Sequence, residues 1–139
     1  MSSKHTIRAV KALKVYCPVD RPTMDLLMRG QLPADDQSSA LATILDLVRA
    51  DNPLGDFGAY KSVVELATGL ETFVPGHDAH PTLGQAGATE VSLTAILTIY
   101  IPADAPEDSV ERVIDKIVAA HPWEVPVIEI SETALVTRI

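Results

Sequence analysis

The most reactive-looking side chains lie close together in His77-Asp78-Ala79-His80. Two imidazoles and one carboxylate within four residues could bind zinc or copper, which accept nitrogen and oxygen ligands. Because the surrounding stretch, residues 68–89, is rich in Gly and Pro, we expect a loop, where sequence spacing fixes no ligand geometry. Asp and Gly neighbours are also common in ordinary polar turns. The pattern leaves a divalent-metal site open and favours a polar loop tip.

A second candidate group is His121-Pro122-Trp123-Glu124, followed by Pro126. His121 and Glu124 could form a ligand-facing pair or an acid–base pair. The alternative is structural, because the helix predicted before His121 ends there and a protonated imidazole would complement its dipole. Pro122 and Pro126 would shape the turn, and Trp123 could bury a large area against a neighbouring subunit. We favour the structural or interface role.

The glycine-rich stretch from Gly69 to Gly87 could hold an anion through backbone N–H groups. It does not match the phosphate-binding P-loop pattern, and no Lys or Arg occurs between Lys61 and Arg112. A bound phosphate would therefore need positive charge from elsewhere in the chain. The candidates are Arg8, Lys11, Lys14 and Lys61. A weakly charged or metal-bridged effector fits the loop at least as well.

No group of residues has the spacing of a catalytic site. Cys17 has no activating partner near it in the sequence, and we expect a small buried residue near a strand end. Ser109, like the other serines, lies in no nucleophile-elbow motif. We therefore predict that the protein is not an enzyme.

Length and composition bound the possible functions. The 139 residues fit a single domain, 1–139, and a hydrophobic content of 47% is typical of globular proteins. The formal net charge of -8, without a basic cluster, argues against nucleic-acid binding. The N-terminus lacks the apolar core of a signal peptide, no apolar run could span a membrane, and Cys17 is the single cysteine. These features predict a cytoplasmic protein without membrane insertion.

The hydrophobic periodicity predicts the elements that must position these groups. Alternation from Thr6 to Cys17 indicates a half-buried strand. Residues 20–36 carry Pro and Gly without a clear period, which predicts a long connection with one helical turn over residues 24–29. Ser38 could cap the next helix. The apolar stripe of that helix comprises Leu41, Ile44, Leu45 and Val48.

The second half repeats this order of elements. A strand is expected over residues 59–67, followed by the long loop of residues 68–89 and a strand over residues 91–101. Asp104-Ala105-Pro106-Glu107 resembles a capping box, and the helix after it ends at His121-Pro122. Its apolar stripe comprises Val110, Val113, Ile114, Ile117 and Val118. The last strand is expected over residues 125–130, with Pro126 indicating an edge.

This order, β-α-β, loop, β-α-β, predicts a fold class. Two such units usually form one antiparallel sheet with both helices on one face. We therefore expect an α+β, ferredoxin-like (βαββαβ) sandwich.

The turn after the last predicted helix resembles a known motif. Residues 120–126, AHPWEVP, are similar to the HPYEVP run of CutA-type proteins and to the AHPYEEP run of the PII-like domain inserted in Nif-three-like (YqfO-type) proteins. The stretch before it resembles the GTGTF-x-P … A-x-P-x-x-G-x-x-G loop of that inserted domain. The matching residues are Gly69, Thr72, Phe73, Pro75, Ala79, Pro81, Gly84 and Gly87, preceded by Gly58 and Tyr60. The resemblance covers residues 58–130.

The resemblance implies a PII/CutA-like form of the ferredoxin-like fold. Its members are typically trimeric, with sheets packed around a shared axis, and PII relatives bind small effectors between subunits. We therefore expect a ligand-binding loop that comprises Gly69, Thr72, Phe73, Pro75, Gly76, Gly84 and Gly87. No activity carries over, because the metal-binding hydrolase-like portion of the Nif-three-like proteins has no counterpart in this sequence.

The sequence also departs from the family pattern. Trp123 replaces the usual tyrosine, Glu71 stands where the family prefers glycine, and residues 20–36 form an extra connection. Neither His77 nor His80 belongs to the loop pattern.

Two functions remain in view. The first is a non-enzymatic, oligomeric PII-like regulatory or sensor protein that holds an effector with the 68–89 loop at a subunit cleft. The alternative is a CutA-like divalent-metal-binding protein that uses His77, Asp78, His80 or His121. The effector could be a small anion or a divalent metal, a homotrimer is expected, and a protein target or a purely structural role stays open.

Overall fold

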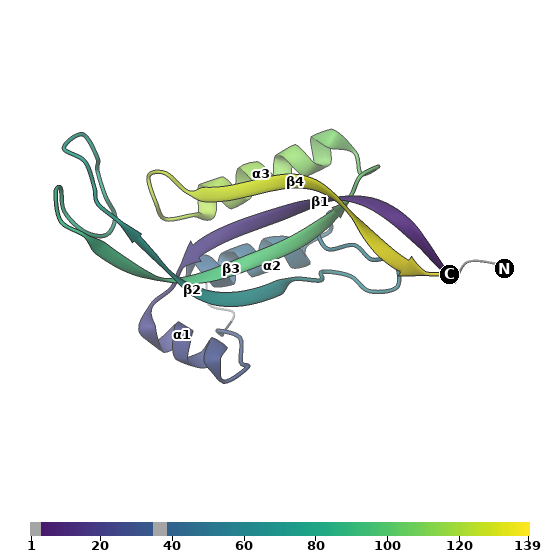
Figure 1. Ribbon diagram of the computed structural model, residues 1–139, viewed down its shortest axis with the longest axis horizontal. Helices are drawn as coiled ribbons and strands as arrows, with labels where there is room; N and C mark the ends of the chain where they lie inside the picture. The colour runs from purple at the N-terminus through teal and green to yellow at the C-terminus, as the bar shows by residue number, and fades with distance from the viewer. Residues whose placement is uncertain (1–3, 35–38) are drawn as a thin grey trace.

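The computed structural model describes residues 4–34 and 39–139, and within these ranges it contains four strands and three helices (Figure 1). Their order is β1 (His5–Pro18), α1 (Arg21–Met28), α2 (Ala40–Arg49), β2 (Glu65–Phe73), β3 (Glu90–Pro102), α3 (Glu107–Ala120) and β4 (Val127–Arg138). The strands form one antiparallel sheet in the order β2-β3-β1-β4. This order confirms the ferredoxin-like α+β prediction.

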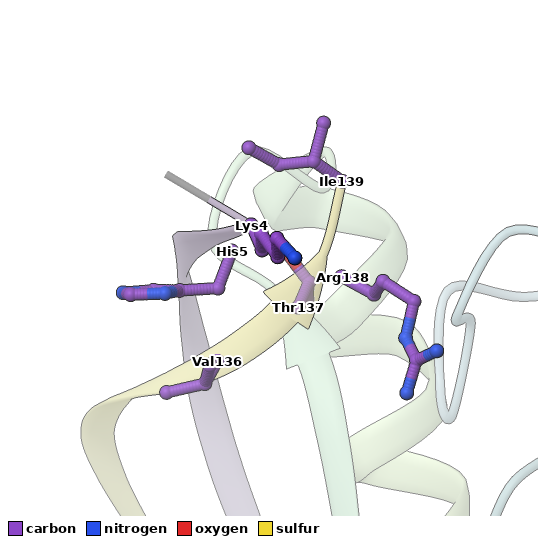
Figure 2. A pocket seen from close by; sticks show the side chains of 6 residues that line it. All are labelled: Lys4, His5, Val136, Thr137, Arg138 and Ile139. Carbon is purple, nitrogen blue, oxygen red and sulfur yellow. The ribbon is translucent and has the colours of Figure 1, made fainter. Parts of the chain in front are cut away.

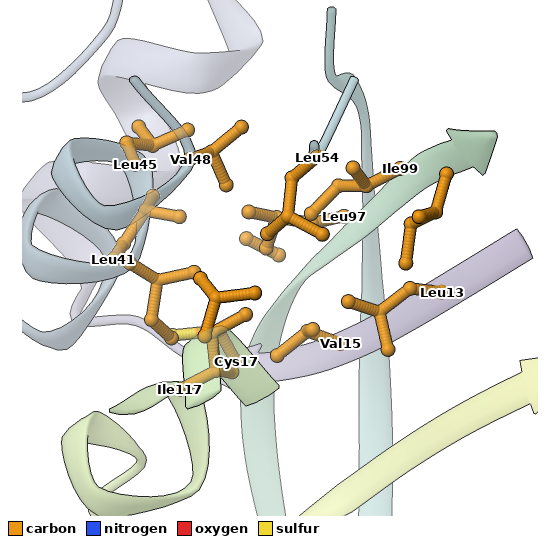
Figure 3. Packing of buried hydrophobic residues seen from close by; sticks show 14 of the residues in the cluster. Leu13, Val15, Cys17, Leu41, Leu45, Val48, Leu54, Leu97, Ile99 and Ile117 are labelled. Atoms are coloured by element: carbon orange, nitrogen blue, oxygen red, sulfur yellow. The ribbon is translucent and has the colours of Figure 1, made fainter. Parts of the chain in front are cut away.

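The core lies between the sheet and the helices α2 and α3, which Figure 1 shows on the same side of the sheet. Alternate residues of β1 and β3 point into it and meet the apolar stripes of both helices (Figure 3), as their periodicity predicts. The core residues of the central strands are Leu13, Val15, Cys17, Ala95, Leu97, Ile99 and Ile101. Those of the helices are Leu41, Ile44, Leu45, Val48, Val110, Val113 and Ile117.

The connection over residues 20–36 contains more helix than predicted. Instead of one turn, α1 extends over eight residues. The Asp20 carboxylate caps it by accepting a hydrogen bond of 2.8 Å from the Thr23 backbone N–H. Pro22 is well tolerated in the first turn, and the buried Met24 attaches the helix to the rest of the molecule.

The helix caps also differ from the predictions. Ser38 lies outside the described residues, and α2 is capped by Ser39, whose Oγ accepts a hydrogen bond of 3.0 Å from the Ala42 N–H. The capping box at residues 104–107 is wrong, because α3 starts only at Glu107 and has no side-chain cap. Before α3 the chain forms a turn instead, which is closed by the hydrogen bond from the Ala105 N–H to the Pro102 carbonyl.

The predicted strand over residues 59–67 is wrong in position, because β2 is Glu65–Phe73. Residues 55–63 form a tight loop instead, closed by a hydrogen bond of 3.1 Å from Val63 N to Gly55 O. Residues 68–73, which were predicted as loop, become strand because each of them pairs with β3, from Thr68 opposite Ala95 to Phe73 opposite Glu90. The connection between β2 and β3 therefore comprises only residues 74–89.

The last strand is longer than predicted. β4 continues to Arg138, and its residues 131–138 pair with the first half of β1, with Leu135 opposite Arg8. Most side chains of this half are exposed, so it lacks the alternation that would reveal a strand in the sequence. β4 is an edge strand directly after Pro126, as that proline predicts. None of the helices in the described ranges combines the length and apolar character needed to cross a membrane.

Candidate functional site

The two sequence motifs meet in space. The connection after β2 (residues 74–89) contacts the turn between α3 and β4 through two hydrogen bonds. The Thr82 hydroxyl donates to the Pro122 carbonyl at 2.8 Å, and the His80 backbone N–H donates to Glu124 Oε1 at 3.1 Å. Both contacts join residues at least 40 positions apart in the chain.

A cleft of about 420 Å³ lies between these two segments. It is lined by residues 71–76, 79 and 81–83 on one side and by residues 123–125 and 127 on the other, and we call it the motif cleft. Phe73 and Trp123 form its aromatic wall, with ring centroids 5.4 Å apart and ring planes tilted by 57°. Its volume is within the usual range of small-molecule sites.

His121 supports the motif cleft from behind. Its ring is buried, Nδ1 accepts a hydrogen bond from the Trp123 N–H at 3.2 Å, and Nε2 lies 2.7 Å from the Tyr16 carbonyl oxygen. This pattern assigns the neutral tautomer with its proton on Nε2, which donates to Tyr16. α3 ends at His121, as the sequence predicts. His121 ties the end of α3 to β1 and orients Trp123.

The predicted loop glycines fall into different groups. Gly84 and Gly87 have φ of +89° and +79°, a conformation that favours glycine, so the backbone itself explains them. Gly69 lies in β2, where a Cβ atom would come within 3.4 Å of the Ile96 side chain. Gly76 differs from all three, because φ is ordinary and a Cβ atom would meet nothing within 4 Å.

The loop histidines lie at the surface of the molecule. His77, Asp78 and His80 are exposed on the connection 74–89, where a hydrogen bond from Ala79 N to Gly76 O closes a turn. In the part of the chain that the structure describes, no three His, Cys, Asp or Glu side chains gather as metal ligands. Metal binding by this group stays a prediction.

The basic residues proposed to neutralise an anion lie elsewhere. None of Arg8, Lys11, Lys14 and Lys61 lines the motif cleft. Lys61 instead forms an ion pair of 2.8 Å with Asp56, and the Arg8 guanidinium donates to the Asp56 carbonyl at 2.9 Å. The hydrogen bond from Lys61, helped by the Gly58 N–H, holds the pKa of the Asp56 carboxyl below its usual value.

Cys17 has the buried position predicted for it, at the end of β1. Burial, reinforced by the negative charge of Glu71, raises the pKa of the Cys17 thiol to about 12. The thiol is therefore protonated at neutral pH and is not a nucleophile.

A second hollow, of about 660 Å³, lies between the start of β1 and the end of β4, lined by residues 4, 5 and 136–139 (Figure 2). Figure 2 shows the side chains of His5 and Arg138 pointing to opposite sides of the strand pair. The side chains of His5 and Arg138 are therefore not directed at one common ligand.

The sequence predicted part of the motif cleft. Of the predicted site residues, the cleft brings together Thr72, Phe73, Pro75, Gly76, Trp123 and Glu124. The other predicted positions do not line it; they are Gly69, His77, Asp78, His80, Gly84, Gly87, His121, Pro122 and Pro126. Sequence reasoning missed Glu71, Val74, Thr82, Leu83, Val125 and Val127 as lining residues. Of these residues, Glu71 could have been noticed in the sequence, because it stands where the family pattern has glycine.

The described fold belongs to the ferredoxin-like class, and comparisons with known proteins narrow the relation. No protein-family model matches the chain. A Listeria innocua protein called GTP cyclohydrolase 1 type 2 homolog is 33% identical over 85 residues, which cover 60% of this chain and 22% of that protein. A Listeria monocytogenes protein of the same name is 32% identical, with the same coverage. The chain therefore spans about a fifth of the length of these relatives.

A solved structure gives the same relation at the level of fold. The Bacillus cereus protein related to NIF3 superposes with a TM-score of 0.59 at 18% identity, covering 96% of this chain and 28% of that one. In fold, the chain is thus similar to one segment of that NIF3-related protein. The more distant relation to PII and CutA proteins stays a prediction.

Proposed function

We propose that the chain is a non-enzymatic, PII-like ligand-binding regulatory module whose effector binds in the motif cleft. The supporting observation is that the two segments carrying the family resemblance, remote in sequence, form the two walls of one cleft. A purely structural role for both motifs would not require a space of ligand size between them.

The chemistry of the walls supports binding rather than catalysis. Among the described residues that line the cleft there is no His, Cys, Lys or Arg, so its possible nucleophiles and bases are two carboxylates and the hydroxyls of Thr72 and Thr82. The name of the Listeria relatives mentions a cyclohydrolase, but the matched segment covers 22% of those proteins. We propose no such activity for this chain.

We also propose that the protein forms a homo-oligomer, a trimer by the family resemblance, through the sheet face opposite the helices. On this face Ile96 lies against Gly69, and Tyr16 pairs with Ile96 across the sheet. Native mass spectrometry measures the stoichiometry directly; a trimer would support the proposal, and a monomer at micromolar concentration would contradict it. A protein target and a cytoplasmic location stay predictions.

The ligand-binding proposal is tested by filling the motif cleft. Gly76 lines it, and since its φ is ordinary and a Cβ atom meets no neighbour, Gly76→Leu adds volume without backbone strain. Native mass spectrometry of freshly purified protein should show a small bound molecule in the wild type that is lost in Gly76→Leu. Gly76→Ala is the matched control, and should retain the molecule.

A melting-temperature screen complements this experiment when the effector is lost on purification. Small molecules of positive, neutral and negative charge are each tested on the wild type and on Gly76→Leu. The proposed function predicts that at least one raises the melting temperature of the wild type only. If no compound does so and no bound molecule is found, the motif cleft is not a ligand site.

A further inference from the structure

The charge of the motif cleft is negative on both walls. Glu71 near the end of β2 and Glu124 in the turn after α3 both line it, and none of the described lining residues is a Lys, Arg or His. The sequence provides no Lys or Arg from residue 62 to residue 111, so the connection between β2 and β3 carries no permanent positive charge, and its two histidines, His77 and His80, do not line the cleft. An anionic ligand would meet two like charges and no partner, which costs binding free energy.

The protein holds each carboxylate by one oxygen. Glu71 Oε1 accepts a hydrogen bond of 3.0 Å from the Thr94 hydroxyl, and Glu124 Oε1 accepts one of 3.1 Å from the His80 N–H. Within the described residues, the second oxygen of each carboxylate has no hydrogen-bond partner. The side chains are therefore positioned by the fold while one acceptor oxygen of each stays available.

The remaining walls are aromatic and aliphatic. Phe73 and Trp123 contribute ring surfaces, and rings of this kind attract cations through their negative faces. Large apolar side chains around the cleft are unusually exposed for their type: Val74 at 57%, Leu83 at 39%, Val125 at 74% and Val127 at 42%. A ligand with an apolar body would cover them and gain hydrophobic stabilisation.

We propose that the ligand of the motif cleft is a small organic cation, an ammonium group joined to an apolar or aromatic body. The carboxylates of Glu71 and Glu124 would accept the ammonium hydrogens, and the body would lie against Phe73 and Trp123. This inference rests on the proposed function, and it names the ligand class that the cleft selects. It excludes nucleotides and other phosphates from this cleft.

Trp123 makes the proposal directly measurable, because it is the only tryptophan of the chain and lies in the cleft wall. Tryptophan fluorescence is titrated with three probes of similar shape: 2-phenylethylammonium, neutral 2-phenylethanol and anionic 3-phenylpropanoate. The ammonium probe should give a saturable change, with an affinity about fivefold or more above that of the neutral probe. The anion should bind more weakly than either. Raising the ionic strength should weaken the ammonium probe only.

Variants assign the effect to the cleft carboxylates. Glu71→Gln removes one charge but keeps an oxygen that can accept the Thr94 hydrogen bond. It should weaken the ammonium probe about fivefold and leave the neutral probe unchanged. Glu65→Gln is the matched control, because it removes the same charge from the other end of β2, outside the cleft lining. It should leave all three affinities as in the wild type.

The outcomes separate the two proposals. If the neutral or anionic probe binds as well as the ammonium probe, or Glu71→Gln binds it unchanged, the cation inference is wrong while the cleft remains a ligand site. If none of the three probes binds, the cation inference is also wrong. The proposed function then fails only if the Gly76→Leu comparison and the melting-temperature screen are negative as well.

Discussion

The two ends of the sheet are built in different ways. At one end, β2 and β3 continue past the end of β1, and their connection contacts the turn before β4 through side chains, enclosing the motif cleft. At the other end, β1 and β4 continue alone as a two-stranded ribbon, with β3 paired to β1 only as far as Val10. Ile7 and Val136, cross-strand partners on this ribbon, are 61% and 71% exposed.

This difference shows where tertiary contacts determine the structure and where backbone pairing suffices. The cleft end needs specific side chains, a buried His121, a half-buried Trp123 and a hydroxyl at Thr82, and these residues fall in the recognisable motifs or beside them. The ribbon end needs only residues that tolerate an extended backbone, so its sequence carries no motif. Substitutions should therefore be costly at the cleft end and nearly neutral at the ribbon end.

The largest effect is expected for Trp123→Ala. This substitution removes the contacts of the Trp123 ring with the rings of Phe73 and His121, and with them the aromatic wall of the cleft. Because Trp123 is only half-buried, we expect a loss of about 2–3 kcal/mol in the free energy of unfolding, below the cost of a fully buried aromatic residue. Chemical denaturation followed by circular dichroism measures it.

The control for that variant is Tyr60→Ala, which truncates an aromatic side chain that is 75% exposed. It should change the free energy of unfolding by less than about 0.5 kcal/mol. Equal losses for the two variants would mean that the motif turn contributes no more to stability than an exposed loop.

The sequence predicts the elements that bury side chains better than those that depend on backbone pairing. The strand β3 and the helices α2 and α3 were predicted well because each buries one face, as with Leu97 and Ile99 in β3. β2 was misplaced because Val63 and Val64 look like strand residues but lie in the loop before it. The second half of β4 was missed because strand pairing with β1, not burial, determines its conformation.

The candidate site was predicted in two pieces but not as one cleft. Motif residues such as Phe73 and Trp123 are recognisable from the sequence. The distance of 5.4 Å between the centroids of their rings, however, depends on how β2 and β3 extend past the end of β1. That extension could not be predicted, since it results from the pairing of residues read as loop. Glu71 shows the same limit, because only the folded chain places its carboxylate in the cleft wall.

A smaller effect, the pH dependence of stability caused by Cys17, tests whether water reaches the end of β1 nearer the motif cleft. The pKa of the Cys17 thiol is about 12 in the folded protein, above its ordinary value of 9.0. The folded state therefore keeps a proton that the unfolded state loses, so this contribution to stability is complete below pH 9 and is lost as the pH rises towards 12. Between pH 8 and pH 10.5 the wild type should lose about 2 kcal/mol more than Cys17→Ala. Parallel pH curves for the two proteins would mean that water reaches the thiol.

The smallest effect is expected at the ribbon end, for the double variant Ile7→Thr and Val136→Thr. Threonine keeps the branched Cβ atom that suits a strand, and the two side chains face each other across β1 and β4. Because both are largely exposed, the free energy of unfolding should change by less than about 0.5 kcal/mol, measured by denaturation at low protein concentration. A loss above about 1 kcal/mol would mean that these side chains are covered in solution. The ribbon would then be held by side-chain contacts, and the contrast between the two ends of the sheet would be lost.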